Sequence, residues 1–409
     1  MEKYSVHKIF KWIGSGLLVL AGLLVVVIIG AYIIYPAEYV SRVLRWQDAD
    51  VKDYQKFPEA VIDNAPPVYQ FEQDHNEAFV RDGFETALAV DDLELFLEDT
   101  GTQAFIVIQD EAILYEGYFN RYTRDSIVTS FSVAKSFVST LVGVAIEEGH
   151  IQSVDDPITD YLPELLERDA QFTNITVGDL MHMSSGIHYV EASFLHGDDA
   201  KTYYYPDLRT LALEETRIDG LPGEEFLYNN YHPLLLGVIL ERATGVSVAE
   251  YLQEKIWKPL GMEYPASWSL DSEDTQFEKM ESGINARAID FAKFGRLFLN
   301  NGGWEGQQVI PAEWVMQATQ RDTSFENGEY YYDSFIFEDG RGYYQYFWWG
   351  LTVDEQTYDY MALGNHGQFI YISPEKDLII VRNGERYGAD TLKWIYAFYD
   401  FARAFPANE

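Results

Sequence analysis

Apolar residues recur at helical spacing between residues 125 and 149. Five of them fall on one stripe: Ala134, Phe137, Val138, Leu141 and Ala145. Spacings of three and four residues are the period of an α-helix that buries one face. Thr129 or Ser130 can cap the start of this helix, and Gly149 can end it. The pattern therefore predicts a core helix that begins near residue 130.

Short apolar runs predict strands towards both ends of the chain. The runs 104–109 and 113–119 flank an Asp-Glu pair and predict a β-hairpin. The runs 369–372 and 378–382 predict a second hairpin, and the aromatic-rich stretch 325–360 predicts further strands and loops. These distant strands are expected to meet in one sheet.

Helical patterns with capping signals dominate the middle of the chain, roughly 151–270. Helices are also expected on either side of it, and the full set is 91–101, 177–183, 232–244, 247–258, 286–300 and 389–404. Strands at both ends with helices between them are typical of an α/β (α+β) fold. We therefore expect one sheet flanked by helices, with an inserted, mostly helical subdomain.

The N-terminal region contains an uncharged run at residues 12–37, dense in Leu, Val and Ile. It is long enough to cross a bilayer as a helix, and too long for the core of a signal peptide. Lysines and arginines flank both sides, so their distribution does not set the orientation. We expect a short inner tail (1–11), a transmembrane anchor (12–37) and an acidic tether (38–85). The large domain would then be extracytoplasmic, in the periplasm or outside the cell.

Charge and composition exclude or disfavour several classes of function. The 409-residue chain has 66 acidic and 29 basic residues, a formal net charge of -37, which disfavours nucleic acid as a partner. It has no cysteine, which excludes disulfides and thiolate catalysis. Its eight histidines are scattered, without a His-Glu-x-x-His motif. The sequence thus implies neither a metal nor another cofactor.

Candidate chemistry begins with the spacing Ser-x-x-Lys, which occurs at Ser5, Ser132 and Ser373. In the copy at Ser132 the motif opens the predicted core helix and brings Lys135 one turn along. A buried lysine at the positive end of a helix has a lowered pKa, so its neutral amine can take the proton of a serine hydroxyl. The structural alternative is a capping serine and a lysine that extends to solvent.

Two further sites carry groups that such a serine needs. Tyr228 can relay a proton, and the amide of Asn230 can orient a substrate carbonyl. In the segment 364–369, a glycine at the entry of an edge strand would let substrate approach the backbone. A strand N–H there, with the N–H of Ser132, can form an oxyanion hole. Taken singly, each group also fits an ordinary packing role.

Together and in this order, three segments resemble the motifs of the serine β-lactamase and penicillin-binding-protein superfamily. They are Ser132-Val133-Ala134-Lys135, Tyr228-Asn229-Asn230 and His366-Gly367-Gln368. The resemblance is specifically to the class C-like branch, which also holds esterases and aminohexanoate-dimer hydrolases. The resemblance covers roughly residues 85–400. It implies a serine hydrolase domain at 86–405 with a β-lactamase/transpeptidase-like fold and an antiparallel sheet.

The resemblance also implies roles for individual residues. Ser132 would be the nucleophile, Lys135 its activator and Tyr228 the proton relay. The substrate-binding residues would be Asn230, His366, Gly367, Gln368 and Phe369.

The third motif departs from the Lys-Thr-Gly of many superfamily members. Without that lysine, a fixed cation for a substrate carboxylate is missing, because histidine is largely neutral near pH 7. The expected substrate is therefore a small ester or amide, with aromatic residues of 330–349 and 203–205 as candidate pocket walls. Two alternatives stay open: a β-lactamase or D-Ala-D-Ala peptidase, and a catalytically reduced envelope scaffold. An α/β-hydrolase is disfavoured, because the chain has no Gly-x-Ser-x-Gly.

Overall fold

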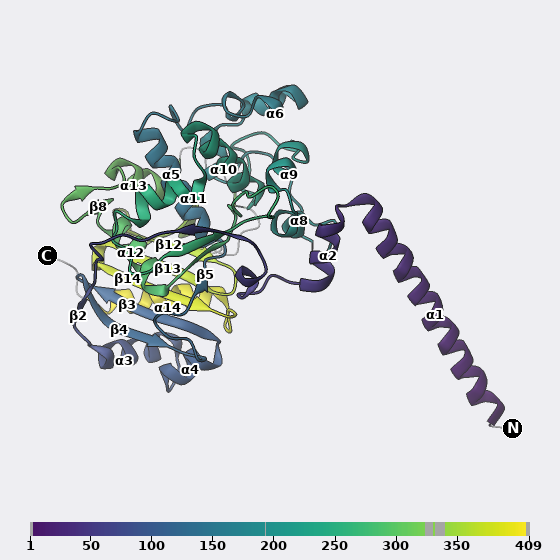
Figure 1. Ribbon diagram of the computed structural model, residues 1–409. Helices are drawn as coiled ribbons and strands as arrows, with labels where there is room; N and C mark the ends of the chain where they lie inside the picture. The colour runs from purple at the N-terminus through teal and green to yellow at the C-terminus, as the bar shows by residue number, and fades with distance from the viewer. Residues whose placement is uncertain (1–2, 193, 324–329, 332–339, 406–409) are drawn as a thin grey trace. The chain divides into compact units, whose positions relative to one another are not determined.

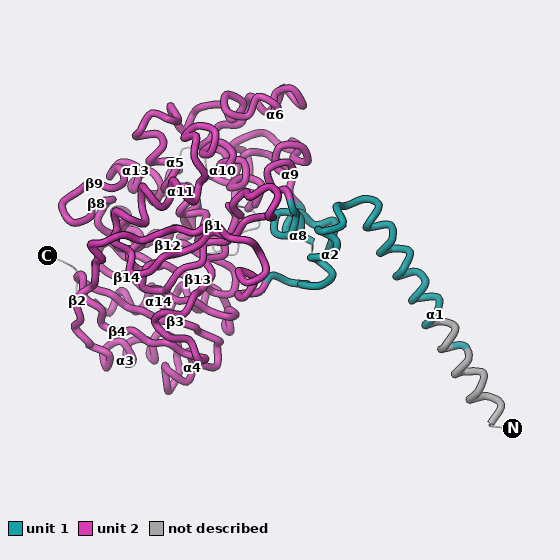
Figure 2. Tube along the Cα trace, in the orientation of Figure 1, with its two compact units in different colours: residues 1–49, 190–206 teal, residues 50–189, 207–409 magenta. Residues whose placement is uncertain are grey.

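The computed structural model describes residues 3–192, 194–323, 330–331 and 340–405 (Figure 1). The chain divides into two compact units (Figure 2). The first comprises residues 1–49 and 190–206, and the second comprises residues 50–189 and 207–409.

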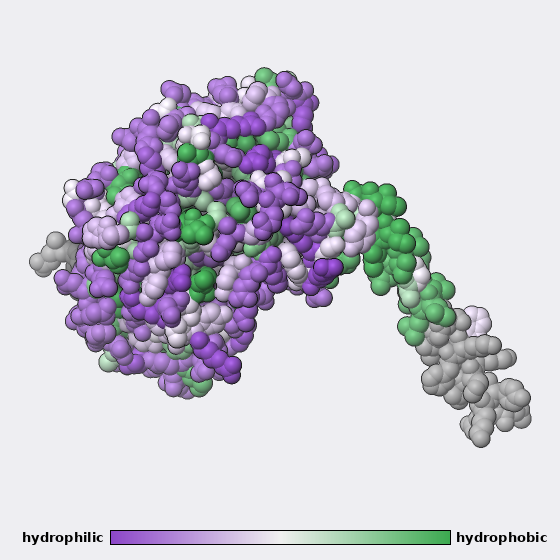
Figure 3. All heavy atoms as spheres, in the orientation of Figure 1, coloured by the Kyte–Doolittle hydropathy of each residue, from purple (hydrophilic) through white to green (hydrophobic). Residues whose placement is uncertain are grey.

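The first unit contains α1 (Lys3–Ile34), α2 (Ala37–Trp46) and α8 (Asp198–Tyr204). In the part of the chain that the structure describes, α1 is the one helix long and apolar enough to cross a membrane. Its window Leu17–Ile34 has a mean hydropathy of 3.1 and is almost wholly exposed, as the apolar surface in Figure 3 shows.

The tyrosines at 203–205 pack inside the first unit. The ring of Tyr205 lies 5.3 Å from that of Tyr39, and the ring of Tyr204 lies 5.9 Å from that of Trp46. The hydroxyl of Tyr39 also donates to the carbonyl of Leu195 (2.9 Å). These rings therefore help to join α2 to the segment 190–206.

The second unit is built on an eight-stranded sheet of order β10-β11-β12-β13-β14-β3-β4-β2. Its strands are β2 (Glu72–Gln73), β3 (Thr102–Gln109), β4 (Ala112–Tyr118), β10 (Gly342–Gln345), β11 (Trp348–Thr352), β12 (Tyr358–Gly364), β13 (Gln368–Ser373) and β14 (Leu378–Gly384). All neighbours are antiparallel except β2 and β4. Both predicted hairpins are confirmed, and the pairing of β14 with β3 joins the two distant halves of the sheet.

Helices cover both faces of this sheet. On one face lies α12 (Ala288–Leu299), where Gly295 faces Ile370 of β13 and Ile379 of β14. On the other lies α14 (Thr391–Arg403), whose Phe398 packs against Phe105 and Phe369. Because side chains alternate along a strand, adjacent residues of β13 serve opposite faces of the sheet.

The predicted helices are largely confirmed, together with a smaller sheet of order β1-β6-β7-β5. The strands of this sheet are β1 (Glu59–Ile62), β5 (Val128–Thr129), β6 (Ala266–Ser269) and β7 (Ile284–Ala286). The remaining helices of the second unit are α3 (Glu77–Leu88), α4 (Leu93–Asp99), α5 (Val133–Glu147), α6 (Pro163–Arg168), α7 (Val177–Met181), α9 (Leu208–Glu214), α10 (Tyr231–Thr244), α11 (Val248–Leu252) and α13 (Ala312–Thr319). A short hairpin of β8 (Gly303–Trp304) and β9 (Gln307–Gln308) precedes α13. Most of the expected helical subdomain, 151–189 and 207–270, belongs to the same compact unit as the large sheet.

The segment 38–85, expected to be a tether, contains ordered elements. Within the second unit, β1 pairs antiparallel with β6, and α3 packs along α14. The buried stripe of α3 consists of Val80, Phe84 and Leu88, at intervals of four residues. The density of acidic residues and prolines around these few apolar positions hid the helical period from the sequence analysis.

Candidate active site

Ser132 stands at the N-cap position of α5, one residue before the helix that was expected to contain it. Its side chain makes no capping hydrogen bond, so the hydroxyl is available for other partners. The expected caps have other tasks. Thr129 pairs with Asn285 across β5 and β7, and the Ser130 hydroxyl accepts a hydrogen bond from the Ile284 N–H (3.1 Å). The small sheet therefore fixes the start of α5.

Lys135 lies next to Ser132 and is buried, with 1% of its surface exposed. Its Nζ is 2.9 Å from the Ser132 Oγ and donates to the carbonyl of Glu281 at 2.9 Å. Burial lowers the pKa of Lys135 to about 7, although the negative charge of Glu281 opposes this shift. A substantial fraction of the amine is then neutral near pH 7 and can accept the serine proton.

Tyr228 is the third residue that the structure brings to this place. Its ring centroid lies 4.9 Å from the Lys135 Nζ. Trp349 stacks on the tyrosine ring at 5.8 Å, and Tyr344 meets it edge-on at 6.1 Å. Two of the aromatic residues expected to line a pocket therefore support Tyr228, while residues 332–339 of that stretch lie outside the described residues.

Asn230 lies two residues after Tyr228, at the N-cap of α10. Its Nδ2 donates to the hydroxyl of Tyr189 (2.9 Å), and its Oδ1 is buried with no hydrogen-bond partner among the described residues. Tyr189 was missed by the sequence analysis, because it lies 41 positions away and belongs to no motif.

The third motif lies beside the start of α5. Gly364, the last residue of β12, lies against the backbone that precedes α5. A Cβ at this position would overlap the Ser130 carbonyl and lie 3.1 Å from the Ser132 nitrogen. His366 and Gly367 form the following turn with φ of 61° and 79°. The His366 ring lies 5.0 Å from that of Phe131, the residue before Ser132. The turn 365–367 therefore borders the serine.

The expected edge strand at this site is an inner strand. β13 pairs with β12 on one side and β14 on the other, so its backbone groups serve the sheet. The Gln368 side chain accepts from Asn383 Nδ2 (3.0 Å) and donates to the Gly384 carbonyl (2.7 Å). Phe369 is fully buried against Phe398. The side chains of Gln368 and Phe369 thus support the strand, and substrate binding by these two residues stays a prediction.

Arg382 supports the turn from behind. This buried residue of β14 donates to the Gly367 carbonyl (2.8 Å) and to Thr102 Oγ1 (3.1 Å), and its guanidinium stacks on Trp394 at 4.1 Å. Burial lowers its pKa to about 9. A Cβ on Gly367 would overlap the guanidinium, which explains the glycine. Sequence spacing gives no signal for a contact of this kind.

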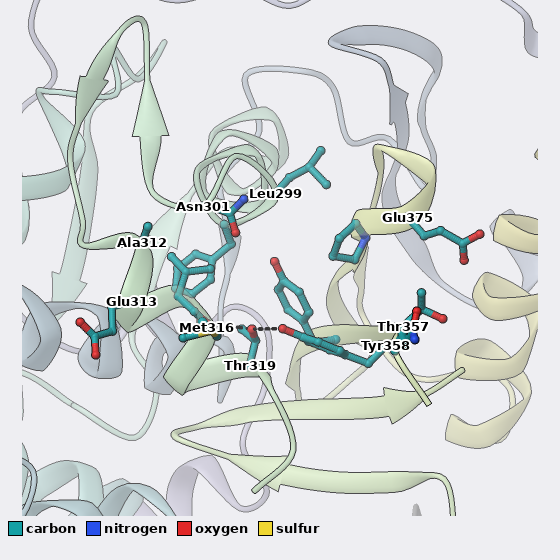
Figure 4. Close-up of a pocket in the computed structure, with 14 residues that line it drawn as sticks. Leu299, Asn301, Ala312, Glu313, Met316, Thr319, Thr357, Tyr358 and Glu375 are labelled. Carbon is teal, nitrogen blue, oxygen red and sulfur yellow. Dashed lines mark hydrogen bonds between the residues drawn. The ribbon is translucent and has the colours of Figure 1, made fainter. Parts of the chain in front are cut away.

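No metal site is evident in the described part of the chain, where no group of three or more acidic or histidine side chains could hold a metal ion. The buried His182 and His232 are neutral, because burial lowers their pKa values to about 4 and 3. A separate pocket of about 780 Å³ lies between α13, β12 and the turn at Pro374 (Figure 4). None of the motif residues lines it.

A serine beside a buried lysine at the start of a core helix, under a mixed α/β fold, defines the class of serine hydrolases related to β-lactamases. A family model described as Beta-lactamase matches residues 97–390. The chain therefore belongs to the β-lactamase family, and it is a serine hydrolase. Membership confirms the resemblance inferred from the three motifs.

Two curated relatives show which members of this family the chain is similar to. The chain is 30% identical to the 6-aminohexanoate-dimer hydrolase of Paenarthrobacter ureafaciens over 329 residues, 75% of this chain and 79% of the relative. It is 28% identical to the teichoic acid D-alanine hydrolase of Staphylococcus aureus strain MRSA252 over 177 residues, 43% of this chain and 42% of the relative.

Solved structures of other proteins show the same fold. A putative 6-aminohexanoate-dimer hydrolase from Bacillus anthracis is similar with a TM-score of 0.73 and 26% identity, covering 88% of this chain and 94% of that one. A class C β-lactamase is similar with a TM-score of 0.58 and 15% identity, covering 83% and 100%. At that identity the second likeness shows the fold alone, which is the β-lactamase/transpeptidase-like fold expected.

Proposed function

We propose that this protein is a membrane-anchored serine hydrolase that cleaves an ester or amide bond through an acyl-enzyme on Ser132. The observation that carries the proposal is the 2.9 Å contact between the Ser132 Oγ and the buried Lys135 amine, whose pKa is lowered to about 7. A lysine paired in this way is a base at neutral pH.

The reaction follows from the positions of these groups. Neutral Lys135 accepts the proton of Ser132 while the Oγ attacks the substrate carbonyl carbon. The Ser132 N–H and the backbone at the turn 365–367 stabilise the oxyanion. Tyr228, close to the Lys135 amine, relays the proton to the leaving group, which departs as an alcohol or amine. Water then attacks the ester of Ser132, with Lys135 and Tyr228 again moving the proton.

Substrate is bound by Asn230 and by the turn 365–367. Asn230, whose buried Oδ1 has no hydrogen-bond partner in the described part of the chain, orients the substrate amide, and His366 with Gly367 borders the acyl group. Likeness to a 6-aminohexanoate-dimer hydrolase and to a teichoic acid D-alanine hydrolase supports linear amides and esters as the substrate class. The absence of a lysine in the third motif supports the same choice over β-lactams.

The test compares a neutral p-nitrophenyl ester, a linear amide and nitrocefin with one preparation of enzyme. We expect ester and amide turnover to exceed nitrocefin turnover in second-order rate constant. Ser132→Ala should lower every rate at least about 1000-fold while the melting temperature changes little, since a helix-start serine contributes about 1 kcal/mol. Near wild-type turnover by Ser132→Ala would move the nucleophile elsewhere, and faster nitrocefin turnover would overturn the substrate class.

The anchor is the run at α1. Its length, its mean hydropathy of 3.1 and its exposed apolar side chains support a single membrane span. The hydrolase domain would then lie outside the cytoplasm, held at the membrane surface, with small esters or amides as its partners.

A further inference from the structure

A buried ion pair adjoins the proposed catalytic lysine, although none of the three motifs contains it. Lys279 and Glu281 form a 2.9 Å salt bridge in which their side chains are only 2% and 3% exposed. Glu281 is also the residue whose backbone carbonyl accepts from the Lys135 Nζ at 2.9 Å. The same residue therefore holds Lys135 through its backbone and carries a buried charge beside it.

The loop that carries the pair is held in one shape. The indole N–H of Trp268 donates to the carbonyls of Lys279 and Ser282, at 3.0 Å each. The Ser282 hydroxyl donates to the same carboxylate oxygen that meets Lys279, at 2.8 Å. The other oxygen, Glu281 Oε2, is buried and has no hydrogen-bond partner among the described residues. The carboxylate is therefore held through one oxygen by an ammonium and a hydroxyl, and its other oxygen has no hydrogen-bond donor among the described residues.

We propose that the Lys279–Glu281 pair sets the pH at which Lys135 becomes a base. Glu281 is a positioning residue that favours the ammonium form of Lys135, and Lys279 limits that effect by neutralising part of the carboxylate. In a buried environment such charges act strongly over several ångströms. The proposal rests on the proposed role of Lys135 and adds the residues that tune it.

Among the described residues, none of the other groups that face Lys135 carries a negative charge that could favour its ammonium form. From α5 the neutral Ser132 hydroxyl meets it, and from the segment before α10 the ring of Tyr228. From α10, His232 is neutral above about pH 3, so its charge is constant over the range of interest. The carboxylate of Glu281 opposes the lowering of the Lys135 pKa by burial. Among these groups, Glu281 carries the negative charge.

The test measures the second-order rate of inactivation by a fluorophosphonate from pH 5 to 9, using the full chain in detergent. For the wild type we expect a rise centred near pH 7. Glu281→Gln should move the rise down by about one pH unit, giving inactivation about fivefold faster at pH 6. Lys279→Met should move it up by about one pH unit, giving inactivation about fivefold slower at pH 7. The double variant should fall between the two.

The matched control is the pair Asp290 and Lys293 of α12, also wholly buried, with a 3.4 Å contact. Asp290→Asn and Lys293→Met should cost stability without moving the rise. If the first two variants leave the rise in place, or move it in the same direction, the proposal is wrong. The double variant keeps the test available if a single variant fails to fold. Labelling that persists in Ser132→Ala would instead overturn the proposed function, so the two failures are distinguishable.

Discussion

At the scale of the residue, Lys135 shows a conflict between stability and chemistry. An unfolded lysine has a pKa of about 10.5, whereas burial lowers the pKa of folded Lys135 to about 7. Between these values the unfolded chain binds more protons, so folding becomes more favourable as pH rises from 7 to 10.5. Below pH 7 the full cost of burying the side chain is present. The protein therefore tolerates a destabilising group in order to hold a base beside Ser132.

We predict that Lys135→Met abolishes hydrolysis and stabilises the fold at pH 6.5. Lowering the pKa from 10.5 to about 7 costs at most about 5 kcal/mol, and the variant loses roughly 1 kcal/mol for each of two hydrogen bonds. A gain of about 2–3 kcal/mol is expected at pH 6.5. It should fall to zero near pH 9 and reverse above that pH, because the cost of burying the charge disappears while the loss of the two hydrogen bonds remains. Thermal unfolding of both proteins at pH 6.5, 8 and 9.5 measures it. A variant less stable than the wild type at pH 6.5 would contradict the buried-amine cost.

At the scale of the element, the sequence was sufficient to predict a helix or a hairpin wherever the pattern that specifies it lies within one segment. The apolar stripe of α5, the start of α7 and the two hairpins were all predicted because their determinants lie within a few residues. The contacts that place the site depend on residues far apart in sequence. Arg382 meets Thr102 across 280 positions, and Gln368 meets Asn383 across 15. No spacing rule finds such pairs, which is why the supporting role of Gln368 was missed.

The clearest of these long-range contacts is the approach of β12 to α5. We predict that Gly364→Ala displaces the start of α5, because a Cβ there would overlap the Ser130 carbonyl, which is backbone and cannot rotate away. Fluorophosphonate labelling should fall at least about 100-fold, with a loss of about 2–3 kcal/mol in stability.

Gly220→Ala is the matched control for that prediction. A Cβ at Gly220 would meet nothing nearer than the Gly186 Cα at 3.6 Å, an ordinary contact. This variant should label and melt like the wild type. Equal labelling by both variants would mean that the β12–α5 approach is not needed to place the serine.

At the scale of the whole molecule, composition and family membership account for different parts of the chain. The Beta-lactamase match covers residues 97–390, and the second compact unit begins earlier, at residue 50. Its ordered β1 and α3 add to the matched part, and their buried apolar residues make them part of the hydrolase fold. The acidic surface, with a net charge of -37, favours repulsion from anionic surfaces and slow approach of anionic substrates.

Location is the last property at this scale, and it depends on α1. We predict that the full chain sediments with membranes and resists extraction by carbonate, because the window Leu17–Ile34 is apolar throughout and long enough to span a bilayer. Removal of residues 1–36 should release the remaining chain into the soluble fraction with its fluorophosphonate labelling intact. Protease added to intact cells should digest the hydrolase domain and abolish labelling, since the domain is proposed to lie outside the cytoplasm. If the domain is protected in intact cells and digested after lysis, the orientation is opposite to the one proposed. If the full chain is found in the soluble fraction, α1 is not a membrane anchor.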